Sequence, residues 1–296
     1  MPRKPLTELI DETLLMDGAM GTLLQRWGLP ERTPSCLWNL QKPEAVQKAH
    51  TAYRKAGSQI LLANTFSASR LLLKQVGFFE SLQKINETGV QLARQAAGKT
   101  GWVLGDIGPT GVQGPPSPKM FEQRVAIFSE QLEVLSRCEV DGILLETLGS
   151  LEEVLAGLET AQRFFPQGPL VLLISIRQNR EGRLEPDPVA VAKAIKQARG
   201  RVVPGVNCSE GPEIVWKALR EMASVLKPPF CAKPNAGLPT RQGNRWVYPV
   251  SPPQMGRYAL RFVEAGARWI GGCCGTDPDH IRAMGKALRL DKGVSF

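Results

Sequence analysis

Histidine is scarce in this chain: there are two, His50 and His280, among 296 residues. A transition-metal site would therefore have to rely on cysteine, of which there are six. No run of about 18 uncharged apolar residues occurs, so neither a transmembrane helix nor a membrane partner is expected. Acidic residues (Glu8, Asp11 and Glu12) interrupt the N-terminal segment where a secretory signal would be apolar. We expect a cytoplasmic protein with reduced thiols.

Clustered positive charge is also missing. The formal net charge is +9, but lysine and arginine are spread along the chain. This distribution indicates a solvated basic surface rather than a nucleic-acid site, so no nucleic-acid partner is expected. An acidic protein partner is left open, and the composition says nothing about oligomeric state.

Eight short apolar runs recur along the chain, each ending in small or polar residues. Their continuous apolar character is typical of strands buried on both faces. The runs start at Leu14, Ser58, Trp102, Gly142, Leu170, Arg201, Phe230 and Arg268.

Helical patterns fill the stretches between these runs. An apolar stripe with alternating spacings of four and three runs from Phe121 to Leu135. Ser150 and Glu153 have the spacing of a capping box, and Asp277 followed by Pro278 has the pattern of a helix start. Four glycines lie between a helical pattern and the next strand, where they suit the C-terminus of the helix. These are Gly57, Gly142, Gly200 and Gly266.

Eight strand–helix units in about 290 residues predict an α/β fold, a single (β/α)8 TIM barrel formed by residues 1–296 as one domain. A doubly wound open sheet is the alternative, but no G-x-G-x-x-G follows the first run. In such barrels the working residues lie at the carboxyl ends of the strands. Most of the runs end in chemically distinctive residues: Asp17, Asn64–Thr65, Asp106, Glu146–Thr147, Asn207–Cys208, Asn235 and Cys273–Cys274.

Three of these residues are cysteines, Cys208, Cys273 and Cys274. The sixth and eighth strands lie two apart in a closed ring, so their ends can converge at the barrel mouth. Three thiolates suit zinc and leave a fourth coordination position open, as in catalytic sites. The alternative is that Cys208 is a buried small apolar residue and the adjacent pair is incidental. Cys36, Cys138 and Cys231 are predicted to be structural.

The motifs DGAMGT (17–22), GVNC (205–208), PNAG-P (234–239) and IGGCCGT-P-HI (270–281) resemble those of the homocysteine S-methyltransferase family. The resemblance runs from about Leu14 to Leu288. It implies zinc held by Cys208, Cys273 and Cys274, with the homocysteine thiolate in the fourth position. Zinc would keep that sulfur deprotonated and directed at a methyl group, giving methionine.

The amino-acid end of homocysteine needs its own partners. Strand-end acids suit its ammonium group, and the resemblance supports Asp17 and Glu146. Backbone N–H groups at Ala19 and Met20 would donate hydrogen bonds to its carboxylate. Asn235 and Asn207 would orient the ligands or the cysteine sulfurs. The roles of Asp106 and Thr65 stay open.

The resemblance leaves open which compound donates the methyl group to homocysteine. The DGAMGT form is closer to cobalamin-dependent methionine synthase than to the betaine enzyme. In that synthase the module would continue into a folate-binding barrel, and we expect no cobalamin-binding domain within this chain. We expect either S-methylmethionine or a methyl-corrinoid protein, with cobalamin then carried by a separate partner. Betaine is disfavoured because aromatics are only 6% of the chain and no aromatic cage is evident.

A different class of function stays as the alternative. The adjacent Cys273 and Cys274 could form a labile bridge in a redox or thiol-sensing barrel.

Overall fold

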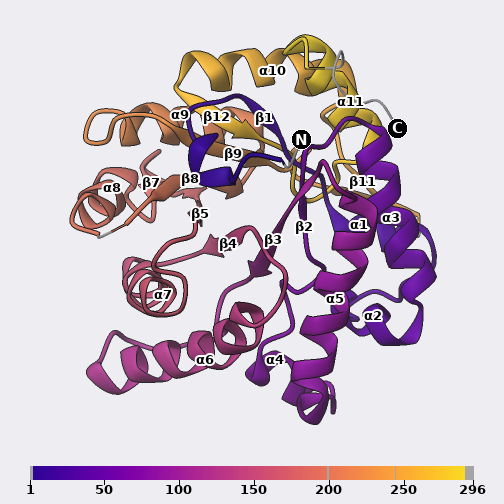
Figure 1. Cartoon of the computed structure of the whole chain (residues 1–296). Helices are drawn as coiled ribbons and strands as arrows, with labels where there is room; N and C mark the ends of the chain where they lie inside the picture. Colours follow the sequence, from indigo (N-terminus) through magenta and orange to yellow (C-terminus); the bar gives the residue numbers. More distant parts are fainter. Residues whose placement is uncertain (1–2, 199, 244, 291–296) are drawn as a thin grey trace.

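The computed structural model describes residues 3–198, 200–243 and 245–290. Over these residues, eight parallel strands form a nearly closed barrel surrounded by helices (Figure 1). The strands are β1 (Leu14–Leu15), β2 (Ile60–Leu62), β3 (Trp102–Ile107), β4 (Gly142–Leu148), β5 (Leu170–Ser175), β8 (Val202–Cys208), β9 (Phe230–Pro234) and β12 (Ala267–Ile270). Each coincides with one of the eight predicted apolar runs, so the predicted (β/α)8 fold is confirmed. That residues 1–296 make one domain stays a prediction.

The order around the barrel is β1-β12-β9-β8-β5-β4-β3-β2. A bridge between Met16 and Ile60 brings β1 and β2 together and nearly closes the ring. Strands β8 and β12 therefore flank β9, as the sequence predicted for the sixth and eighth strands, and β3 lies across the ring from β9.

Helices cover the outside of the barrel. They are α1 (Met20–Arg26), α2 (Trp38–Gln41), α3 (Pro43–Lys55), α4 (Arg70–Gln75), α5 (Leu82–Ala97), α6 (Pro118–Ser136), α7 (Leu151–Phe164), α8 (Pro188–Lys196), α9 (Pro212–Met222), α10 (Pro252–Glu264) and α11 (Pro278–Ala287), with 3-10 turns at Leu6–Glu8, Ser35–Leu37 and Phe79–Ser81. No helix within the described ranges combines the length and the apolar character needed to cross a bilayer.

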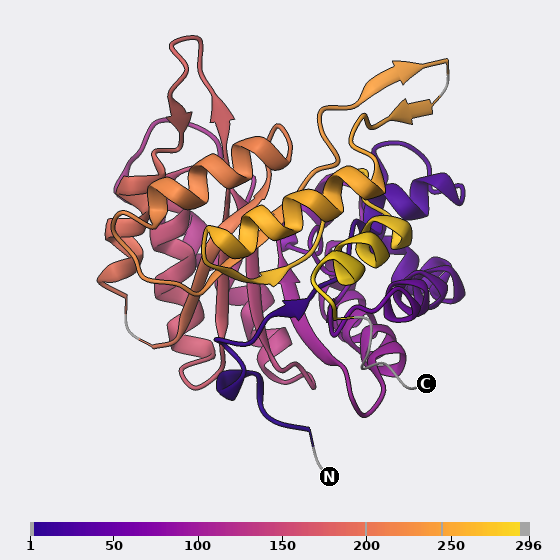
Figure 2. The ribbon, with the colours of Figure 1, turned by 90° about the horizontal axis from the view of Figure 1, so that it is seen from above.

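Two hairpins rise from the carboxyl end of the barrel, while the N-terminal segment lies at the opposite end (Figure 2). They are formed by β6 (Arg177–Gln178) with β7 (Leu184–Glu185), and by β10 (Thr240–Gln242) with β11 (Arg245–Val247). At the other end, the buried side chain of Leu6 joins the core cluster inside the barrel. The indole N–H of Trp102 donates to the Lys4 carbonyl at 3.0 Å. The barrel is thus filled and closed at its base and opens at the strand ends that carry the polar residues.

The helix signals in the sequence have mixed outcomes. Asp277 caps α11, and its carboxylate accepts from the N–H groups of Asp279 and His280. Ser150 caps α7 as predicted, but only half of the expected capping box forms. The Glu153 carboxylate instead accepts from the N–H and hydroxyl of Thr110, both at 2.7 Å.

Three of the four predicted capping glycines, Gly57, Gly200 and Gly266, have positive φ angles. The fourth prediction was wrong, because Gly142 is the first residue of β4. A Cβ there would come within 2.6 Å of the Pro169 carbonyl oxygen. Close packing, rather than a helix end, is the reason for glycine at this position.

Candidate active site

Three cysteine sulfurs lie together at the carboxyl end of the barrel. Cys208 ends β8, and Cys273 and Cys274 follow β12. Their Sγ atoms all lie within 4.8 Å of one another. All six cysteines of the chain are free thiols. The convergence expected from the order of the strands is therefore present.

The backbone around the cysteines is held by the end of β9. The Cys273 N–H donates to the Pro234 carbonyl at 2.8 Å, and the Ala236 N–H donates to the Cys274 carbonyl at 2.9 Å. On the other side, the Asn235 N–H donates to the Cys208 carbonyl at 3.0 Å. Cys208 itself has a φ of 52°, in the left-handed region that a non-glycine residue rarely adopts. These contacts turn both chain segments out of extended geometry, which allows adjacent cysteines to face one point.

Gly275 is the glycine on which this turn depends most. Its φ is 80°, and a Cβ there would lie 2.2 Å from the Tyr248 ring. We expect Gly275→Ala to cost at least about 1–3 kcal/mol for the backbone conformation alone and to displace the cysteine loop. Thermal unfolding and bound-metal analysis would both report the loss. Gly149→Ala is the matched control, because nothing lies within 4 Å of the added Cβ. Unchanged metal content in Gly275→Ala would contradict this account.

The three thiols strongly affect one another. Contacts with the Cys273 and Cys274 thiols lower the pKa of Cys208 to about 3. Contact with Cys208 raises the pKa of Cys273 well above its ordinary value and that of Cys274 to about 12. The group thus readily carries one negative charge, whereas further ionisation would place like charges close together. A bound cation would remove this obstacle.

The sulfur atoms fit a zinc ion. Tetrahedral zinc with Zn–S bonds of about 2.3 Å would place its sulfur ligands about 3.8 Å apart. The observed upper limit of 4.8 Å needs only a small adjustment to reach that spacing. Soft thiolate sulfurs also bind zinc in preference to magnesium or calcium.

The sulfurs border a cavity of about 280 Å³ at the mouth of the barrel. Its floor is a layer of polar side chains, one inward-facing position further along the strands than the apolar side chains of the barrel interior. Alternate residues along each strand point inward, and the interior cluster contains Leu104, Leu144 and Cys231. The next inward positions on these strands are Asp106, Glu146 and Lys233, and all three line the cavity together with Asp17.

Lys233 is a functional candidate that the sequence analysis missed. It is 1% exposed, and its Nζ lies 3.3 Å from Asp17 Oδ1 and 3.2 Å from the Asp17 carbonyl oxygen. Burial is the largest single effect and lowers the pKa of Lys233, but the combined attraction of Asp17, Glu146 and two cysteines outweighs it and raises the pKa above its ordinary value. The other Asp17 oxygen accepts from the Leu62 N–H at 2.8 Å. Asp17 lines the cavity, but both of its oxygens already have protein partners, and its contact with the substrate stays a prediction.

Glu146, unlike Asp17, keeps one carboxylate oxygen available to bind a ligand. Its Oε2 accepts from the Asn207 side-chain amide at 3.1 Å. Burial raises the pKa of Glu146 to about 7, and the nearby Cys208 and Asp17 add to the rise against the opposing effect of Lys233. The Asn207 amide also lies 3.9 Å from Cys273 Sγ, so this residue links the acid to the sulfur cluster.

The remaining predicted residues lie around the same mouth. The Asn235 amide nitrogen donates to the Ser209 carbonyl at 3.0 Å, and its oxygen is buried without a partner among the described residues. The Ala19 N–H donates to the Thr276 hydroxyl at 3.3 Å. Met20 begins α1, where N–H groups lack acceptors within the helix.

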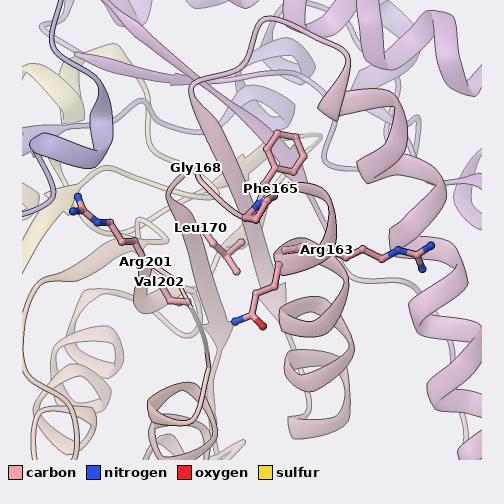
Figure 3. A pocket seen from close by; sticks show the side chains of 10 residues that line it. Arg163, Phe165, Gly168, Leu170, Arg201 and Val202 are labelled. Atoms are coloured by element: carbon pink, nitrogen blue, oxygen red, sulfur yellow. The ribbon is translucent and has the colours of Figure 1, made fainter.

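Two other cavities help to define the site. One, of about 520 Å³, lies between α1 and the β10–β11 hairpin and shares Thr22 and Gln25 with the sulfur-lined cavity. The other, of about 360 Å³, is bordered by Phe165, Leu170 and Val202 (Figure 3). Because Leu170 and Val202 begin their strands, that cavity belongs to the base of the barrel, away from the cysteines.

Comparisons with known proteins point to one family. The sequence model described as "Homocysteine S-methyltransferase" matches residues 14–288. Methionine synthase from Mycobacterium leprae is 27% identical over 304 residues, covering 96% of this chain and 25% of that protein. Its counterpart from Mycobacterium tuberculosis is 26% identical, covering 98% of this chain and 26% of that protein. The chain thus spans about a quarter of the length of these relatives.

Solved structures agree. The metallated form of the homocysteine methyltransferase MmuM from Escherichia coli is 25% identical, with a TM-score of 0.77, and the match covers 96% of this chain and 99% of that one. Its oxidized form is 26% identical, with a TM-score of 0.76 and the same coverage.

Proposed function

The chain belongs to the homocysteine S-methyltransferase family, and from this premise we propose that it transfers a methyl group to the sulfur of homocysteine, giving methionine. In this proposal Cys208, Cys273 and Cys274 hold a zinc ion, and the substrate thiolate takes the fourth position. The observation that carries the proposal is the meeting of three sulfurs within 4.8 Å at the border of a cavity large enough for an amino acid. Bound zinc would supply Lewis acidity that keeps the incoming thiol deprotonated.

The protein's own residues would orient the substrate. Glu146 would pair with the ammonium group, since only one of its carboxylate oxygens accepts a hydrogen bond from the described residues and the side chain lines the cavity. Asp17 would line the substrate cavity next to Glu146, with its carboxylate paired to the Lys233 ammonium. The N–H groups of Ala19 and Met20 would donate to the substrate carboxylate, and the Ala19 N–H would give up its 3.3 Å contact with the Thr276 hydroxyl to do so. Asn235 would steady Cys208 from the end of β9.

The charge of the cavity bears on the methyl donor. Its lining contains three carboxyl groups, those of Asp17, Asp106 and Glu146, and one ammonium group, that of Lys233. A cation in the cavity would favour the ionised forms of these carboxyl groups, so the lining suits a small cationic donor such as S-methylmethionine. A methyl-corrinoid partner protein is the second candidate.

The test is a donor panel with purified protein and homocysteine. S-methylmethionine, S-adenosylmethionine, betaine and a methylcobalamin-loaded partner would be compared by methionine formation, with zinc measured in the same preparation. We expect about one zinc per chain and methionine from at least one donor. The redox alternative predicts a metal-free protein with a reversibly oxidised Cys273–Cys274 pair, and that result would overturn the proposal. The family match does not favour this alternative.

Glu146 should make binding of the substrate's amino-acid end depend on pH. Its pKa is raised to about 7, and only the ionised carboxylate can pair with an ammonium group. Below about pH 7 the dissociation constant should therefore rise about tenfold per pH unit, and above it should level off. Homoserine is a suitable calorimetric probe, because it has the same amino-acid end without a titrating thiol. Glu146→Gln should bind weakly and lose this pH dependence. A wild-type profile that is flat between pH 5.5 and 8 would refute the assignment.

A further inference from the structure

Asp106 is the acid of the cavity whose carboxyl group forms no hydrogen bond with the residues that the structure describes. It is 6% exposed, and its Oδ1 atom is buried without a hydrogen-bond partner in the part of the chain that the structure describes. Its backbone, in contrast, is firmly held. Its N–H donates to the Thr65 hydroxyl at 3.2 Å, and that hydroxyl donates to its carbonyl at 2.7 Å. A fixed backbone that presents an unpartnered carboxyl group to a cavity is the arrangement of a ligand-binding residue.

The other two acids of the cavity have hydrogen-bond or ion-pair partners within the protein. Asp17 has Lys233 and the Leu62 N–H, and Glu146 has the Asn207 amide. Burial and the nearby Glu146 raise the pKa of Asp106 well above its ordinary value. The nearby Lys233 opposes this rise but does not cancel it, so the ionised form of Asp106 is only partly compensated within the protein, and a cation in the cavity would complete the compensation.

The position of Asp106 in the barrel indicates that this cation is the methyl donor. Asp106 belongs to β3, and the sulfurs belong to β8 and β12, on either side of β9. Strand β3 lies across the ring from β9. In an in-line methyl transfer the departing group sits beyond the methyl carbon, on the far side from the attacking sulfur. A donor in that arrangement would place its own sulfur toward the β3 side of the mouth.

An aromatic ring lies close to Gly108, two residues beyond Asp106. Phe66 lines the same cavity, and its ring packs so closely on Gly108 that a Cβ there would approach it within 2.7 Å. The Gly108 N–H also donates to the Phe66 carbonyl at 2.9 Å. A carboxylate and an aromatic ring that line the same cavity are a favourable setting for a sulfonium ion, which is attracted to both without forming hydrogen bonds of its own.

We propose that Asp106, with the ring of Phe66, is a specificity-determining residue that binds the positive charge of a sulfonium methyl donor. This inference rests on the proposed function. In the transfer, a lone pair of the homocysteine thiolate forms the new S–CH3 bond as the C–S⁺ bond of the donor breaks. The electron pair of that bond stays on the donor sulfur, which becomes a neutral thioether. The cation that Asp106 compensates thus disappears in the reaction, so Asp106 should favour donor over demethylated product.

The test compares S-methylmethionine with methionine, its neutral thioether, by calorimetric titration in the absence of homocysteine. The wild-type protein should bind the sulfonium at least about tenfold more tightly than the thioether, and Asp106→Asn should reduce this ratio to about one. In turnover, Asp106→Asn should raise KM for S-methylmethionine about 10- to 100-fold while KM for homocysteine and zinc content stay within about twofold. Asp106→Glu should recover part of the preference.

Two further variants keep the test decisive. Glu159→Gln removes an exposed charge on α7 and should change nothing. Phe66→Leu should lower the sulfonium preference about threefold, and it supplies the answer if Asp106→Asn fails to fold. An unchanged binding ratio in Asp106→Asn, a selective rise in KM for homocysteine, or a wild-type enzyme active only with methylcobalamin would overturn the inference and leave the proposed function intact. A wild-type protein inactive with every donor would instead refute the proposed function.

Discussion

Replacing Cys273 by serine is expected to remove bound zinc and to lower kcat/KM by at least about 100-fold. Serine has nearly the same shape, but its hydroxyl stays protonated where a thiolate is required, so two sulfurs would remain of the three that lie within 4.8 Å. Without the metal, homocysteine would react through the few per cent of thiol that ionises near pH 7. Cys208→Ser and Cys274→Ser should behave alike, because each removes one ligand of the same ion.

Cys138→Ser is the matched control for this experiment. Cys138 is a free thiol near the end of α6, and its Sγ donates to the Val134 carbonyl at 3.3 Å. A serine hydroxyl can make the same contact, so zinc content and turnover should match the wild-type values. Metal analysis and methionine formation would be measured on the same samples under reducing conditions. Full turnover from a zinc-free Cys273→Ser protein would exclude the proposed mechanism.

The barrel itself was predictable because its signals are local. Each strand is a short apolar run buried on both faces, and this character can be read without knowing the strand's neighbours. The sulfur cluster followed from the fold, because strand order places the ends of β8 and β12 on either side of β9. The left-handed conformation of Cys208 was not predictable, since it depends on contacts with the end of β9.

The errors and omissions arose where a side chain's partner is distant in sequence. Glu153 was assigned to a local capping box, yet it binds Thr110, 43 residues away. Lys233 lies within an apolar run of the sequence, and its partner Asp17 is 216 residues away. Inward alternation along β9 would have placed Lys233 two residues beyond the buried Cys231, and the same rule places Asp106 beyond Leu104. Pairing between such inward positions needs the closed ring, which no single segment encodes.

Lys233→Met is expected to lower the free energy of unfolding by about 3–5 kcal/mol. Methionine fills nearly the same volume, but it leaves Asp17, which is 2% exposed, without its cation. The Asp17 carbonyl oxygen keeps a partner, because the Gly272 N–H donates to it at 3.0 Å. The loss should therefore report the unpaired carboxylate rather than a missing backbone hydrogen bond. Denaturant unfolding measures it, and Lys227→Met, at an exposed position, should change stability by less than about 0.5 kcal/mol.

A second substitution separates charge from packing. Asp17→Asn keeps an oxygen that can accept from the Leu62 N–H but carries no charge that needs Lys233. If the buried charge causes the instability, the double variant Asp17→Asn/Lys233→Met should be more stable than Lys233→Met alone, with a coupling energy of about 2–3 kcal/mol. If the lysine acts only by filling space, the two effects should add and no recovery should occur. Zinc content should persist in the double variant, since neither side chain supplies a sulfur ligand. Weak homocysteine binding in that variant would then assign the ion pair to the substrate site, independently of its contribution to the fold.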